Sequence, residues 1–295
     1  MVAGQGIAGG AEAGMAASVP RIGVALGSGG ARGLAHISYI EALDEMGLAP
    51  AVIAGTSIGA LIGAGWANGM TGAELREHAL RMLGNVQELA GRLWMSSKPT
   101  LEGFMSNGIS MQIDAHNITE AFLPDAFPDD FAALTIPFNV LATDYHAWSQ
   151  VVFRSGSLRQ AISASLAIPA IFRPVRIGEQ VFIDGGATNP LPVDRAGIGS
   201  DIVIAIDVNG TPDDPAEKGD PNPIDVGFVA TQIMTQSIVR STLEIHEPDI
   251  YVHPPAKGIR TLEFWRIREL LAQVDEGKDD FKRTVEAQLA AFAAR

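Results

Sequence analysis

The first third of the chain alternates short apolar runs with glycine-rich turns. Residues 21–26 and 51–54 are almost wholly apolar, as expected for buried strands. Between them, an apolar side chain recurs at every third position from Leu34 to Met46, which predicts a helix that Gly47 ends. This alternation of strand and helix predicts an α/β fold around a largely parallel sheet.

The rest of the chain continues the same pattern. We predict strands at residues 137–144, 150–153, 202–208 and 250–252, a hairpin at 175–183, and helices at 72–83, 158–166, 224–245 and 262–295. Thr71 and Glu74 have the spacing of a capping box at the start of the first of these helices. The chain shows no internal repeat. Residues 20–295 are therefore predicted to form one domain, with a motif-bearing core at 21–208 and carboxyl-terminal helices at 224–295.

Two segments are less regular. Residues 84–130 mix helical stretches with apolar bulk, including Trp94 and Met95. We expect this segment to help to shape an apolar binding cleft, although ordinary helix packing explains the same composition equally well. Residues 211–223 are polar and rich in proline, as expected for a mobile loop.

A sharp turn is predicted around Ser57. The stretch 55–59 (GTSIG) follows the second apolar run and precedes residues that can begin a helix. Glycines two positions before and after a serine allow a strand to turn into a helix with the serine at the apex, which is the nucleophile-elbow pattern. The pattern specifies only three of five positions and also occurs by chance. A nucleophilic serine further needs a base, oxyanion donors and an acyl pocket.

The donors have a candidate in the glycine-rich turn at residues 27–33, between the first strand and the first helix. Glycines at such a position let backbone N–H groups converge on an anion. A nucleotide phosphate loop is the alternative. The dinucleotide pattern GxGxxG fails because Arg32 occupies its last position, and the chain has no GK[ST] of a Walker loop.

The base is less obvious. In the order Ser, Asp, His of the α/β hydrolases, the histidine could only be His246 or His253, and neither lies in a turn of catalytic type. Asp184 instead ends an apolar strand and precedes two glycines. Its carboxylate therefore has the position and the room of a site residue in an open α/β sheet. Asp-Gly-Gly is also an ordinary turn sequence.

Composition limits the function further. The chain has 295 residues, a net charge of -13 and no cysteine. The acidic charge argues against nucleic-acid binding, which needs clustered Lys and Arg. It also opposes attraction to anionic lipids, so peripheral membrane contact is expected to be apolar or local. Thiol catalysis, disulfides and cysteine-ligated metal are excluded, and no loop has the ligand spacing of a calcium site. We expect no metal and no cofactor.

Targeting signals are not evident. Residues 1–19 are rich in Ala and Gly and lack the charged start and compact apolar core of a signal peptide, so we expect a flexible tail. The most apolar stretch, 49–67, contains several glycines and is interrupted by Thr56 and Ser57. It is predicted to be strand, turn and helix rather than a membrane span. A cytoplasmic location is the default expectation.

Three motifs in order resemble those of the patatin-like phospholipases. They are SGGARG at residues 28–33, GTSIG at 55–59 and DGG at 184–186. Further blocks that resemble the family lie at residues 142–144, 164–169, 172–175 and 189–192. The resemblance covers about residues 21–208 and looks closest to the bacterial, single-domain members.

The resemblance implies a three-layer α/β/α sandwich around a mainly parallel sheet, and hydrolysis of the acyl esters of lipids. It implies a catalytic dyad of Ser57 and Asp184 without histidine. It also implies an oxyanion hole formed by the backbone N–H groups of Gly29, Gly30 and Arg32.

The resemblance also covers the glycines that flank the two predicted catalytic residues, namely Gly55, Gly59, Gly185 and Gly186. Ser28 stands where many members of the family have glycine, a change that keeps the backbone N–H. Two other functions use the same residues. One is a non-catalytic protein that binds an acyl group or a partner, and the other is an acyltransferase whose acceptor is not water. The sequence specifies neither the lipid headgroup, the chain length nor the oligomeric state.

Overall fold

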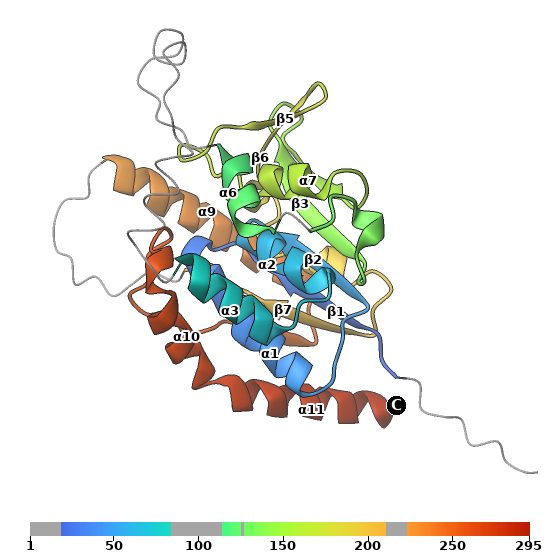
Figure 1. Cartoon of the computed structure of the whole chain (residues 1–295). Helices are drawn as coiled ribbons and strands as arrows, with labels where there is room; N and C mark the ends of the chain where they lie inside the picture. Colours follow the sequence, from blue (N-terminus) through green and yellow to red (C-terminus); the bar gives the residue numbers. More distant parts are fainter. Residues whose placement is uncertain (1–18, 84–113, 125–126, 211–222) are drawn as a thin grey trace, which may run out of the picture.

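The computed structural model describes residues 19–83, 114–124, 127–210 and 223–295 (Figure 1). Within these residues the chain alternates strands and helices in the order that the sequence predicts. The strands belong to one sheet, and helices from both halves of the chain pack on it.

Three predictions fall outside the described residues. They concern the amino-terminal tail, the polar loop that begins at residue 211, and the apolar cleft expected from Trp94 and Met95. Of the irregular 84–130 segment, the structure describes one α-helix, α6 at Ala115–Phe122. The next described helical element, the 3-10 turn at Phe131–Ala133, begins just after this segment.

The described strands form one eight-stranded sheet. They are β1 Ile22–Leu26, β2 Val52–Thr56, β3 Phe138–Asp144, β4 Ser149–Phe153, β5 Val175–Ile177, β6 Gln180–Asp184, β7 Ile202–Ile206 and β8 Ile250–Val252. The order is β5-β6-β3-β2-β1-β7-β8, and β4 pairs with β3. The neighbours from β3 to β8 are parallel, whereas β4, β5 and β6 pair in the antiparallel sense. The mainly parallel sheet predicted from the sequence is confirmed.

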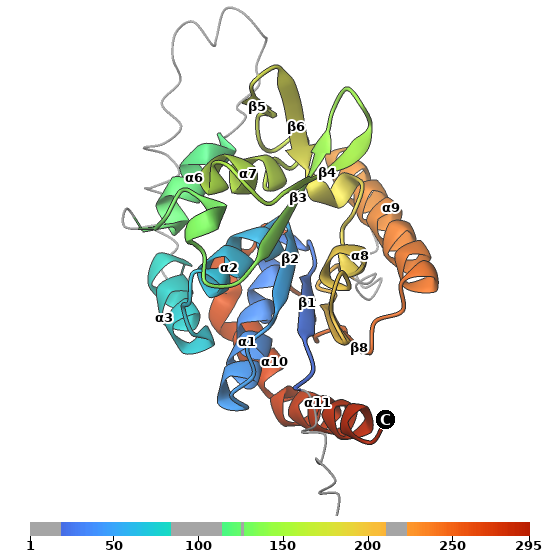
Figure 2. The ribbon, with the colours of Figure 1, turned by 90° about the vertical axis from the view of Figure 1, so that its right-hand side faces the viewer.

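Helices cover both faces of the sheet. The described α-helices are α1 His36–Glu45, α2 Ile58–Ala67, α3 Gly72–Leu83, α6, α7 Leu158–Ser165, α8 Val193–Ala196, α9 Pro223–Ile245, α10 Ile267–Asp275 and α11 Lys278–Ala293. The described 3-10 helices are η1 Gly30–Ala35, η2 Phe131–Ala133, η3 Gly185–Ala187 and η4 Phe264–Arg266. In Figure 2, α1, α2, α3 and α10 lie on one side of β1 and β2, and α8 and α9 lie on the other. This is the predicted three-layer α/β/α arrangement.

The two faces of the sheet are packed differently because successive strand residues point in opposite directions. Val24 belongs to the large core beneath α1 and α2, whereas Ala25 and Ala205 belong to a smaller cluster against α8 and α9. Small residues let α8 approach the sheet closely. A Cβ added at Gly23 would lie only 2.0 Å from the carbonyl oxygen of Ala196.

The positions of β2 and β6 along β3 determine the geometry of the site. The last residue of β2, Thr56, lies opposite Leu141 in a parallel pair. The last residue of β6, Asp184, lies opposite Ala142 in an antiparallel pair. Because β4 occupies the other edge of β3 at both positions, β2 and β6 share one edge and run toward each other along it. The residue after β2 therefore meets the end of β6.

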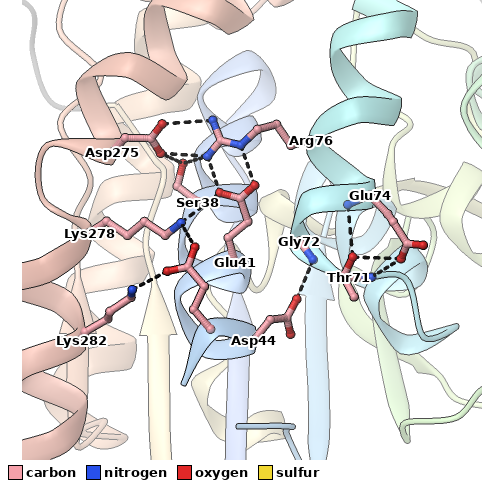
Figure 3. Close-up of polar contacts among 11 residues, drawn as sticks. Ser38, Glu41, Asp44, Thr71, Gly72, Glu74, Arg76, Asp275, Lys278 and Lys282 are labelled. Atoms are coloured by element: carbon pink, nitrogen blue, oxygen red, sulfur yellow. Dashed lines mark hydrogen bonds and ion pairs between the residues drawn. The ribbon is translucent and has the colours of Figure 1, made fainter. Parts of the chain in front are cut away.

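A charged cluster fastens α10 and α11 to the amino-terminal helices (Figure 3). Arg76 of α3 donates to both carboxylate oxygens of Glu41 in α1, at 2.5 and 2.6 Å. Arg76 also donates to Asp275 of α10 at 2.8 Å, and Lys278 of α11 donates to Glu41 at 3.2 Å. The cluster joins four helices across the chain.

Local predictions are confirmed at one helix end and corrected at another. The N–H of Thr71 donates to the Glu74 carboxylate at 2.8 Å, and the N–H of Glu74 donates to the Thr71 hydroxyl at 3.2 Å, as a capping box requires (Figure 3). The helical stretch predicted at 262–295 is largely confirmed but is not continuous. It divides into η4, α10 and α11, with Gly277 before α11, because glycine is a poor residue for a helix interior. None of the described helices is both long and apolar enough to cross a membrane.

Candidate active site

Ser57 lies between β2 and α2. Its backbone has φ 56° and ψ -122°, a conformation that residues other than glycine seldom adopt. Close contacts require glycine on either side. A Cβ at Gly55 would lie 2.6 Å from the carbonyl oxygen of Gly59, and one at Gly59 would lie 2.2 Å from that of Leu26. The strand, sharp turn and helix that a nucleophile elbow needs are all present.

The side chain of Ser57 contacts Asp184. Ser57 Oγ donates to Asp184 Oδ2 at 2.5 Å, and the Gly186 N–H donates to Asp184 Oδ1 at 2.7 Å. A Cβ at Gly185 would lie 2.3 Å from the Leu141 carbonyl oxygen, so the turn packs directly on β3. Burial raises the pKa of Asp184 to about 6, although the hydrogen bonds from Ser57 and Gly186 oppose this rise. The carboxylate is therefore ionised at neutral pH and can accept a proton.

One short segment holds the backbones of both residues. The N–H of Ser57 donates to Ser165 Oγ at 2.8 Å, and that hydroxyl donates to the Leu141 carbonyl at 2.6 Å. Two residues further on, the carbonyl of Ala167 accepts the N–H of Asp184 at 2.9 Å. In the sequence this segment is one of the matching blocks, but nothing in the pattern gives Ser165 a role.

The glycine-rich turn offers few unused donors. The N–H groups of Ser28 and Ala31 each donate to a backbone carbonyl at 2.8 Å. Those of Gly29 and Gly30 have no acceptor among the residues that the structure describes. Gly30 has φ 60°, in the left-handed region that favours glycine. Both glycines line the same cavity as Ser57.

Arg32 is the third residue of η1. In a 3-10 turn this position directs the N–H back toward the carbonyl of the residue three before it, here Gly29. Its buried side chain contacts the segment after β8. Nη1 donates to the Ile259 carbonyl at 3.0 Å, and Nη2 donates to the Thr261 hydroxyl at 3.3 Å. Arg32 thereby fastens the glycine-rich turn to a distant part of the chain.

Two buried side chains hold the start of the turn. His36 Nε2 lies 2.9 Å from the Gly27 carbonyl and donates to it, and burial lowers the pKa of His36 to about 4, so the ring is neutral. Ser28 Oγ donates to Asn209 Oδ1 at 3.1 Å. The Asn209 amide group in turn donates to Asp207 at 2.8 Å, which sets its orientation. The sequence alone gave no reason to single out Asn209.

These residues surround a cavity of about 120 Å³. Its walls come from the glycine-rich turn, the elbow, Ile168 and Pro169, the Asp184 turn, and Thr231, Gln232 and Thr235 of α9. Gln232 Nε2 donates to the Thr261 hydroxyl at 3.0 Å. The helix α9 therefore faces the cavity with polar side chains and is tied across it.

None of the six histidines, all within the described residues, hydrogen-bonds Ser57. His246 lines a separate and larger cavity of about 430 Å³, which includes neither Ser57 nor Asp184. His253 Nδ1 lies 3.7 Å from Asp207. Across the described parts of the chain, no group of three His, Asp or Glu side chains is placed to hold a metal ion.

The fold is that of an α/β/α protein in which a nucleophile elbow, with Ser57 at its apex, joins a strand of the sheet to a helix. A family model described as Patatin-like phospholipase matches residues 24–196, more than half of the chain. The chain belongs to the patatin-like phospholipase family.

Individual relatives are similar over different shares of their length. An NTE family protein of Mycobacterium tuberculosis is 35% identical over 208 residues, which cover 70% of this chain and 54% of that protein. Lysophospholipase nte1 of Aspergillus fumigatus is 26% identical over 84% of this chain and 17% of that protein. The crystal structure of VipD from Legionella pneumophila aligns with a TM-score of 0.49 at 14% identity, over 92% of this chain and 67% of that chain. The chain spans about half the length of the mycobacterial relative.

Proposed function

We propose that this chain is a serine acyl hydrolase that cleaves the fatty acyl esters of lipids, with Ser57 as nucleophile and Asp184 as base. The observation that carries the proposal is the 2.5 Å hydrogen bond from Ser57 Oγ to Asp184 Oδ2 in a buried site. Family membership supports a lipid substrate. The name of the Aspergillus relative, a lysophospholipase, supports a single-chain phospholipid as the first substrate to test.

In the first half-reaction, Ser57 Oγ attacks the ester carbonyl carbon while its proton passes to Asp184 Oδ2. The carbonyl oxygen becomes an oxyanion, which accepts hydrogen bonds from the N–H groups of Gly29 and Gly30. One such donor is worth roughly 3–4 kcal/mol in comparable sites. The bond to the alcohol oxygen then breaks, and that oxygen takes the proton from Asp184. The acyl group remains as an ester on Ser57.

In the second half-reaction, water attacks the acyl ester and gives a proton to Asp184. The same N–H groups hold the second oxyanion. The bond to Ser57 Oγ breaks, Oγ regains the proton from Asp184, and the fatty acid leaves. No histidine is needed, because the carboxylate accepts directly from the hydroxyl and its raised pKa makes it a stronger base than an exposed aspartate.

A substrate panel tests the proposal. Lysophosphatidylcholine, diacyl phosphatidylcholine and a short-chain nitrophenyl ester are incubated with wild type, Ser57→Ala and Asp184→Asn, and fatty acid release is measured. Both variants are expected to lose at least about 10³-fold in kcat. Circular dichroism confirms that each variant is folded. Full activity of Ser57→Ala on any of the three substrates would show that another nucleophile acts.

Two further measurements separate the alternatives. A fluorophosphonate probe is expected to label wild type at Ser57 and to leave Ser57→Ala unlabelled. If the chain only binds acyl groups and does not catalyse, the probe would leave even the wild-type protein unlabelled. Product analysis with an added alcohol acceptor distinguishes release of fatty acid to water from transfer of the acyl group.

A further inference from the structure

Residues 226–236 of α9 have their polar and apolar sides reversed. A surface helix of a water-soluble protein normally buries apolar side chains and exposes polar ones. Here the side chains that face the site cavity or bond across it are polar, namely Thr231, Gln232, Thr235 and Gln236. The large side chains that are about half exposed or more are apolar, namely Val226, Val229, Ile233 and Met234.

The exposed apolar side chains continue onto the segment beside α9. Leu262 and Trp265 are 41% and 44% exposed, and they follow Thr261, which Gln232 of α9 contacts. We define the apolar rim as Val226, Val229, Ile233, Met234, Leu262 and Trp265. The rim holds six of the twelve exposed large apolar side chains in the described residues. Exposure is thus concentrated on α9, which lines the site cavity, and on the residues that follow Thr261, which also lines it. Such a concentration marks an interaction surface.

Charge is absent from this part of α9. No Asp, Glu, Lys or Arg occurs between Asp225 and Arg240, although 19% of the chain is charged. Charged side chains oppose transfer of a helix face into a hydrocarbon boundary, and residues 226–239 contain none. Trp265 adds an aromatic ring of the kind that is enriched at the interface between membrane and water.

We propose that the apolar rim docks on the surface of a zwitterionic phospholipid bilayer. The inference rests on the proposed function, since a lipid ester has to reach the cavity from such a surface, and the rim lies on α9 and next to Thr261, both of which line the cavity. The net charge of -13 disfavours an anionic surface. The six rim side chains are apolar, and the charged neighbours of Leu262 and Trp265, Glu263 and Arg266, form an ion pair with each other. The rim therefore suits a neutral surface.

Vesicle sedimentation with the full chain tests the docking. Phosphatidylcholine vesicles are mixed with wild type, with the double variant Val229→Glu and Ile233→Glu, and with Ile198→Glu. Ile198 is the matched control because it is an equally exposed apolar residue, at 63% against 62% for Ile233, on the connection between α8 and β7. The double variant is expected to lose at least about tenfold in vesicle affinity, because binding no longer transfers two apolar side chains from water into the bilayer. The control is expected to bind as wild type does.

Turnover of a soluble nitrophenyl ester by the double variant reports whether its active site is folded. Ser57→Ala separates the two proposals, because it is expected to lose hydrolysis and to keep vesicle binding. Wild type that binds vesicles but hydrolyses no ester would contradict the proposed function and leave the docking intact. Docking is overturned if wild type does not bind the vesicles, or if the double variant binds them equally well. A double variant that changes only from dimer to monomer in analytical ultracentrifugation would make the rim a subunit interface and overturn the proposal.

Discussion

The backbone N–H of Ser57 donates a hydrogen bond to the hydroxyl of Ser165 at 2.8 Å. The same hydroxyl donates to the Leu141 carbonyl, so it ties the strained elbow to β3. Ser165→Ala would leave a buried N–H without a partner, at a cost of about 1–3 kcal/mol in the free energy of unfolding. We expect kcat on a soluble ester to fall at least about tenfold as well, because the nucleophile loses its position.

Ser163 provides the matched control on the same helix. It is buried, and its hydroxyl hydrogen-bonds the Thr119 hydroxyl and the Arg159 carbonyl rather than the elbow. Ser163→Ala is expected to lower the stability to urea by a similar amount and to change kcat by less than about twofold. Equal kcat values for the two variants would show that Ser165 acts only on stability.

The ionisation of Asp184 predicts the pH dependence of activity. Because burial raises its pKa to about 6, the carboxylate is available as a base above this pH and is protonated below it. The kcat/KM for a soluble ester is expected to level off above about pH 7 and to fall about tenfold per pH unit well below pH 6. His246→Ala and His253→Ala are expected to keep this profile. Loss of the acid limb in either variant would assign it to a histidine.

The raised pKa of Asp184 also predicts that the stability of the protein depends on pH. The pKa of Asp184 is about 6 in the folded chain and ordinarily 3.8, so its ionisation opposes folding. The penalty is absent below about pH 4, grows between about pH 4 and pH 6, and stays at roughly 3 kcal/mol above that. Asp184→Asn is therefore expected to be more stable than wild type at pH 8 and not at pH 4. Urea unfolding at both pH values measures this, and a stability gain at pH 4 alone would reverse the sign.

The charged cluster predicts that Arg76 holds the carboxyl-terminal helices. Its guanidinium group binds Glu41, whose side chain is only 10% exposed, and Asp275. Arg76→Ala would leave a largely buried carboxylate with a weaker partner, and is expected to cost about 2–3 kcal/mol in unfolding free energy. Arg81→Ala removes an exposed pair with Glu77 and should cost less than about 0.5 kcal/mol. Similar losses from both variants in urea titrations would argue against a stabilising role for the cluster.

Elements with a strong local pattern were predicted well. The apolar runs became β1 and β2, the three-residue repeat after Leu34 became α1, and the Thr71 capping box formed as expected. The helix expected to start at Leu34 instead begins as the 3-10 turn η1, because the glycine-rich turn continues to Gly33. Hydrophobic periodicity identifies an element, but it does not specify the type of its first turn.

The site residues divide in a similar way. Ser57 and the glycines around it follow from a local pattern, because a sharp turn between strand and helix requires small neighbours. Ser165, Asn209 and Thr261 carry no such signal. Each acts through a hydrogen bond to a residue at least 108 positions away in the chain. A serine, an asparagine or a threonine in those positions looks like any other polar residue.

The sequence by itself determined the alternation of strands and helices, the serine at the apex of a turn and the aspartate at the end of a strand. Only the tertiary structure decided that Ser57 and Asp184, 127 residues apart, are hydrogen-bonded. They meet because β2 and β6 run toward each other along one edge of β3 and end at adjacent residues of it. That register depends on hydrogen bonds between strands that are distant in the chain, and no local pattern of side chains encodes it.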